Sequence, residues 1–160
     1  MDETTLGYQL LWPTTMITIG VTALSAWALG ARIYFSAHTA RKIRQLATLV
    51  FIGYCLIVLM VTQDFAVAII HYLPGALFLS LSLALKYRQT KEKKIFLGLC
   101  GMGLILIGSG FQQARVTIHP PYFNHNALYH LIQGVALFMI FKSAQWFVAQ
   151  NGKEEKNSHV

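Results

Sequence analysis

Five long apolar segments, separated by short polar or basic stretches, limit the folds open to this chain more than any other feature. They run from about Leu10 to Phe35, Leu46 to Val61, Phe65 to Leu85, Ile95 to Phe111 and Ala127 to Val148. An α-helix crosses a bilayer with roughly 20 apolar residues and satisfies its own backbone hydrogen bonds there. We therefore predict an all-α fold, an integral membrane bundle of five transmembrane helices.

Composition supports this assignment, because 55% of the 160 residues are hydrophobic and only 12% are charged. The length suits one domain. We predict a single transmembrane domain over residues 1–150 and a polar, disordered cytoplasmic tail over residues 151–160. The net charge of +7 does not indicate nucleic acid as a partner, since the basic residues lie between apolar segments.

The basic residues also predict the orientation of the chain. They concentrate in two stretches that we expect to be loops, HTARKIR (38–44) and KYRQTKEKK (86–94). If the five segments alternate in direction, 12 of the 13 Lys and Arg residues fall on one side, and only Arg115 falls on the other. By the positive-inside rule, the C-terminus is cytoplasmic and the N-terminus is outside.

One polar stretch, HPPYFNHNALYHLIQ (119–133), stands out between two strongly apolar ones. It holds three of the six histidines of the chain. Polar groups in apolar surroundings are costly unless they are paired or used. We interpret this stretch as the mouth of a site on the outer face, with residues 120–123 as part of an ordered loop over the bundle.

Candidate site residues lie at the outer ends of three segments. Asp64 and His71 are seven residues apart and share one helical face, as do Asn126, His130 and Gln133 on the last segment. Asn126 is also the expected N-cap of that segment. If these faces converge, His71 and His130 face each other across one pocket. Its members are Asp64, His71, Gln112, His125, Asn126 and His130.

Histidines beside a carboxylate are typical of a zinc site. In this hypothesis His71, His130 and His125 are metal ligands, and Asp64 is a ligand or a general base. Gln112 or Asn126 orients the substrate carbonyl. Zinc-activated water would then hydrolyse an amide or ester of a lipid-like substrate that enters sideways from the bilayer.

Two alternatives remain open from the same residues. His71 and His130, on neighbouring helices, could coordinate one haem axially, as in a membrane cytochrome. The protein could instead be a non-catalytic lipid-binding or scaffolding subunit, in which each histidine is a hydrogen-bonded structural residue. Membrane lipids, a second copy of the chain or a larger membrane complex are then its partners. Gly101 with Gly108, and Gly103 with Gly110, mark faces where helices can approach closely.

The motifs IIHYLPGALF, FQQARVTIHP and YFNHNALYHLIQGVALF resemble an uncharacterised family of bacterial integral membrane proteins. The resemblance covers roughly Asp64 to Phe141 and implies a location in the bacterial inner membrane, but no activity. Asn126 to His130 followed by LIQGVALF is also similar to the last helix of the alkaline ceramidase superfamily, which includes the adiponectin receptors. That second resemblance implies metal-dependent hydrolysis. The chain departs from its pattern in having Asn126 at the first histidine position and five spans rather than seven.

Overall fold

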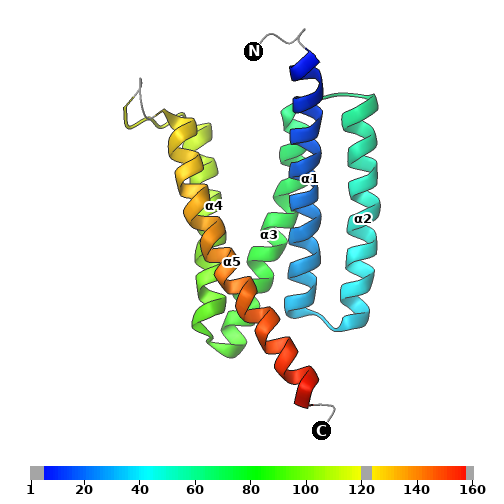
Figure 1. Cartoon of the computed structure of the whole chain (residues 1–160), viewed down its shortest axis with the longest axis vertical. Helices are drawn as coiled ribbons and strands as arrows, with labels where there is room; N and C mark the ends of the chain where they lie inside the picture. Colours follow the sequence, from blue (N-terminus) through cyan, green and yellow to red (C-terminus); the bar gives the residue numbers. More distant parts are fainter. Residues whose placement is uncertain (1–5, 120–123, 158–160) are drawn as a thin grey trace. The chain divides into compact units, whose positions relative to one another are not determined.

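The computed structural model describes residues 6–119 and 124–157, and the regular structure of this part of the chain is five α-helices (Figure 1). All five are long and apolar enough to cross a membrane. The prediction of an all-α, five-helix membrane protein is therefore confirmed. Their bounds are α1 Leu6–Tyr34, α2 Ala37–Met60, α3 Phe65–Thr90, α4 Lys93–Gln113 and α5 His125–Asn157.

The helices extend further into the basic stretches than expected. HTARKIR is helical, because α2 begins at Ala37, and α3 continues through Thr90. The prediction of two basic loops is wrong for most of these residues. Lys and Arg are good helix formers, and their long side chains can reach the membrane surface from a helix end. Only Lys91 and Glu92 connect α3 to α4, and Lys91 has a φ of 56°, the left-handed conformation that ends many helices.

The chain divides into two compact units, Met1–Ser82 and Leu83–Val160, which are described separately. We call them unit 1 and unit 2. Helix α3 runs from the first into the second. In unit 2, α5 continues to Asn157, so the expected disorder of the polar tail is wrong for residues 152–157.

Unit 1 is built on the antiparallel pair α1 and α2, with the first part of α3 against α1 (Figure 1). Its core contains Met16, Tyr54, Val58 and Ala68. The buried Tyr54 hydroxyl donates a hydrogen bond of 2.7 Å to the Met16 carbonyl. Gly20 lies directly under the Tyr54 ring, so α1 can approach α2 closely only because this residue has no side chain.

Unit 2 is held together by close packing of α4 against α5. A Cβ atom at Gly98 or Gly101 would overlap α5, at Ser143 and at the Ala136 carbonyl respectively. Gly108 packs against Ile132 on the same side. At Gly103 and Gly110 a Cβ atom would meet nothing within 4 Å. Of the two predicted glycine faces, the Gly101/Gly108 face is therefore the one that meets α5.

Candidate functional site

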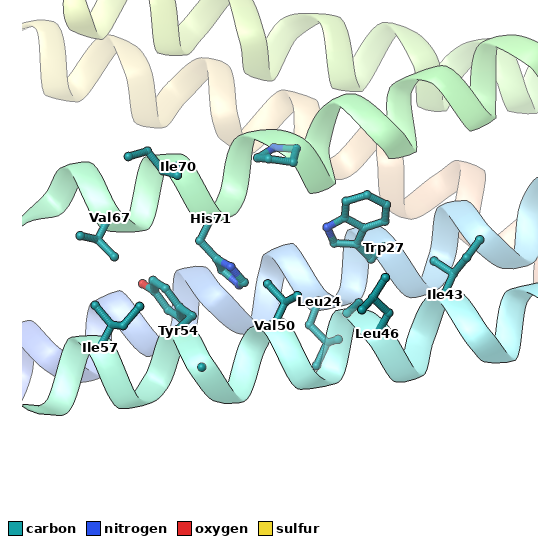
Figure 2. A pocket seen from close by; sticks show the side chains of 13 residues that line it. Leu24, Trp27, Ile43, Leu46, Val50, Tyr54, Ile57, Val67, Ile70 and His71 are labelled. Carbon is teal, nitrogen blue, oxygen red and sulfur yellow. The ribbon is translucent and has the colours of Figure 1, made fainter.

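A pocket of about 500 Å³ opens between the three helices of unit 1 (Figure 2). This volume lies in the range of ordinary small-molecule sites. The side chains around it are almost all apolar, apart from the His71 imidazole and the Tyr54 hydroxyl group. The lining residues are Leu24 and Trp27 of α1, Ile43, Leu46, Ala47, Val50, Gly53, Tyr54 and Ile57 of α2, and Val67, Ile70, His71 and Pro74 of α3.

His71 extends from α3 toward α2 (Figure 2). Its ring stacks on Tyr54, with the centroids 4.2 Å apart and the planes 9° from parallel. The Gly20 backbone of α1 is a close neighbour of the ring. Nε2 is buried and has no hydrogen-bond partner among the described residues. One face of the ring is therefore covered by Tyr54, and one ring nitrogen has no hydrogen-bond partner among the described residues.

The pocket is elongated and open to the outside of the unit. Its lining on α2 extends from Ile43 to Ile57, a rise of about 21 Å at 1.5 Å per residue. Two side chains at its edge are strongly exposed, Leu46 at 64% and Ile70 at 72%. These exposed apolar side chains are suited to contact with hydrocarbon.

Asp64, predicted as a ligand or base, caps α3 in the structure. Its Oδ1 accepts a hydrogen bond of 2.9 Å from the Ala66 backbone amide, and its own amide donates to Thr62 Oγ1 at 3.2 Å. A carboxylate at this position also complements the positive end of the helix dipole. His71 lies two turns further along α3, about 10 Å in helical rise. A local structural role thus accounts for the hydrogen bonds of Asp64.

In unit 2 the structure brings two of the predicted site residues together. Gln112, at the end of α4, donates a hydrogen bond of 2.8 Å from Nε2 to Asn126 Oδ1, at the start of α5. Asn126 was predicted to be the N-cap of α5, but it is not, and its side chain bonds to Gln112 instead. Asn124 is the N-cap, and its Oδ1 accepts from the Ala127 amide at 3.1 Å. The buried Oε1 of Gln112 has no partner among the described residues.

The remaining predicted histidines also lie in unit 2. His130 is exposed, and its Nδ1 lies 3.2 Å from Gln133 Oε1. Gln133 in turn donates to the Tyr129 hydroxyl at 3.3 Å. His125 is the first residue of α5 and is half-buried. Residues 120–123, predicted to belong to an ordered loop over the bundle, lie outside the described residues.

The zinc hypothesis needs ligands from both units, because His125 and His130 lie in unit 2. Nowhere in 6–119 and 124–157 do three His, Cys, Asp or Glu side chains gather closely enough to hold a metal ion. His71 belongs to unit 1, whereas His130 belongs to unit 2. The predicted pairing of these histidines, through zinc or through haem, therefore stays a prediction.

Sequence reasoning missed the residues that surround His71. Tyr54 and Gly53 lie in the middle of a span, and Trp27 completes the pocket from α1. The indole of Trp27 stacks on Phe78, with the ring centroids 4.4 Å apart. A signal was present, because tyrosine is usually found at membrane interfaces, whereas Tyr54 lies in the middle of the apolar segment 46–61.

Comparison with known proteins places the chain in a family but gives no activity. No curated protein and no solved structure matches the chain. The model of a family of unknown function, DUF6962, matches residues 1–147, which agrees with the resemblance to an uncharacterised membrane-protein family. The match covers nearly all of the five-helix region, and the chain therefore belongs to DUF6962, a family of unknown function.

Proposed function

We propose that this protein binds a lipid-like molecule in the lateral pocket of unit 1, with the polar group of the ligand at His71. The observation that carries the proposal is the free Nε2 of His71 in an otherwise apolar pocket of about 500 Å³. A buried polar atom without a partner costs about 1–3 kcal/mol. A ligand that hydrogen-bonds to Nε2 recovers this cost, and its apolar part fills the space between α2 and α3.

The chemistry of the His71 imidazole determines which polar group the ligand must carry. We assign the contact with the Gly20 backbone to Nδ1, because Nε2 has no partner among the described residues, and the Gly20 carbonyl would then accept a hydrogen bond from Nδ1. In a neutral imidazole, one nitrogen donates and the other accepts. Nε2 is then an acceptor, so the ligand must donate a hydrogen bond. A hydroxyl group on a long hydrocarbon chain, as in a fatty or isoprenoid alcohol or a diacylglycerol, fits this requirement.

A long-chain alcohol with a brominated chain tests the proposal, because bromine quenches tryptophan fluorescence at short range. Trp27 lines the pocket. Binding in the pocket is therefore measured as the part of the fluorescence quenching that disappears when Trp27 is replaced by phenylalanine. We expect the alcohol to bind more tightly than its methyl ether, which cannot donate a hydrogen bond. One hydrogen bond of about 0.5–1.5 kcal/mol corresponds to a difference of roughly 2- to 10-fold.

Two variants separate the contribution of the His71 hydrogen bond to ligand binding from the contribution of the pocket volume. His71→Leu should make the alcohol and the ether bind equally. Gly53→Leu should weaken both, because Gly53 lines the pocket and has open space around it, so that a new side chain fills the cavity. Equal binding of alcohol and ether to the unmodified protein would contradict the hydroxyl assignment. Unchanged quenching in Gly53→Leu would show that the ligand binds elsewhere.

The location that best suits this function is the bacterial inner membrane, with the N-terminus outside and the C-terminus in the cytoplasm. The distribution of the basic residues supports this orientation, since Arg115 alone lies on the other side. A reporter active only in the cytoplasm should work when fused at Lys153 and fail beside Thr117. Cytoplasmic activity at Thr117 would reverse the orientation.

A further inference from the structure

A second, smaller pocket lies at the basic end of α1 and α2. Its volume is about 180 Å³, and it shares no lining residue with the His71 pocket. Three arginines surround it, Arg32 from the last turn of α1 and Arg41 and Arg44 from the first turns of α2. The rest of its lining consists of the small residues Ala28, Ala37 and Ala40, which leave room between the guanidinium groups.

Within the described residues of unit 1, no carboxylate lies near this pocket to balance its positive charge. Asp64 is the only acidic residue among the described residues of unit 1, and it lies beyond the opposite end of α2. The start of α2 adds to the positive potential. Its N-cap, Ser36, makes no side-chain bond to a backbone amide, because its hydroxyl bonds to Thr39 Oγ1 instead. The first amides of a helix are a favourable place for an anion.

The pocket lies where a lipid headgroup would be. Arg32 is in the last turn of an apolar helix long enough to span the membrane. Tyr34 and Phe35 follow it, with their rings 5.2 Å apart and edge to face. Such half-exposed aromatic residues are typical of the membrane interface, at the depth of the lipid headgroups. A phosphate group in the pocket can then be part of a lipid whose chains lie in the adjacent bilayer.

We propose that Arg32, Arg41 and Arg44 form a binding site for the phosphate group of an anionic membrane lipid. Each guanidinium can donate two parallel hydrogen bonds to phosphate oxygens, a geometry that lysine cannot reproduce. Three arginines around one small cavity therefore bind a phosphate in a defined position. This site is independent of the ligand proposed for the His71 pocket.

The test is lipid binding to the purified full-length protein in neutral detergent, measured by native mass spectrometry with phosphatidylglycerol and with phosphatidylcholine. We expect phosphatidylglycerol to bind more tightly. Each Arg→Gln change should weaken it by about 5-fold, and the triple change by about 100-fold, since a basic residue near a membrane surface contributes about 1 kcal/mol. The binding of phosphatidylcholine should change little.

A matched control removes the same charge from unit 2, as Arg88→Gln, Lys93→Gln and Lys94→Gln together. If this variant loses as much affinity as the arginine triple, binding reflects net charge, and the proposed site is wrong. Arg32→Lys, Arg41→Lys and Arg44→Lys together keep the charge but lose the paired hydrogen bonds. Weakened binding in this variant supports the site, whereas unchanged binding overturns it.

A competition experiment with inorganic phosphate distinguishes a lipid phosphate group from free phosphate as the ligand of this site. Added to the lipid-free protein, it should bind far more weakly than phosphatidylglycerol, because it lacks chains in the bilayer. Inorganic phosphate that displaces phosphatidylglycerol at equal concentration would overturn the lipid assignment. Thermal unfolding of each variant, measured in parallel, shows whether a loss of binding comes from a loss of fold.

Discussion

Gly101→Ile is expected to push α4 away from α5 and to lower the stability of the protein by about 1–3 kcal/mol or more, the usual cost of overfilling a packed contact. A Cβ atom at Gly101 would lie 2.8 Å from the Ala136 carbonyl oxygen and 3.2 Å from Met139 Cβ. Neither atom can rotate away, because one belongs to the backbone of α5 and the other is attached directly to it. The helices themselves must therefore move.

Gly103→Ile is the matched control, two residues away on the same helix. A Cβ atom there meets nothing within 4 Å, and the change in helix propensity is the same. The midpoint of thermal unfolding in detergent should fall for Gly101→Ile and remain close to that of the unmodified protein for Gly103→Ile. Equal midpoints for the two variants would show that α4 and α5 do not pack through this face.

Gly20→Leu is expected to destabilise unit 1 and to remove the lipid-like ligand from its pocket. A Cβ atom at Gly20 would lie 2.5 Å from Tyr54 Cε1 and 2.9 Å from Phe51 Cε2. The Tyr54 ring cannot move aside without losing its hydrogen bond to the Met16 carbonyl and its stacking on His71. Both stability and ligand binding should therefore fall together.

The control for Gly20→Leu is Gly53→Leu, which lies on the pocket side of α2. Because nothing lies within 4 Å of a Cβ atom at Gly53, the fold should tolerate the new side chain while the pocket loses volume. Thermal unfolding and quenching by the brominated alcohol, measured on both variants, separate the two effects. An unchanged unfolding midpoint in Gly20→Leu would mean that α1 and α2 are further apart than the structure shows.

The amino-acid sequence by itself was sufficient to predict the class of fold and the order of its spans. Apolar segments of this length leave a chain few alternatives, since unpaired backbone groups are costly in hydrocarbon. Their ends were less well predicted. The basic residues around Arg41 indicated a loop, but they belong to α2. A helix forms its own backbone hydrogen bonds at the membrane surface as well as in the membrane interior.

Parts of the candidate site also followed from the sequence. Gln112 and Asn126 were placed in one candidate pocket because both lie at outer helix ends, and in the structure their side chains form a hydrogen bond. His71 was identified as a polar residue within a span, and it lines the pocket of about 500 Å³ in unit 1. Asp64 was assigned a chemical role, whereas in the structure its carboxylate caps α3. A carboxylate before a helix serves as a cap far more often than as a base, and sequence spacing alone does not separate the two.

Only the tertiary structure decided which face of each helix meets a neighbour. In a soluble helix the apolar face marks the core, but all faces of a membrane helix are apolar, and helices associate through local fit instead. The sequence therefore could not distinguish Gly101, which contacts α5, from Gly103, which does not. For the same reason it did not indicate that Tyr54 and Trp27 surround His71. These residues are far apart along the chain, and the packing of α1, α2 and α3 brings them to one pocket.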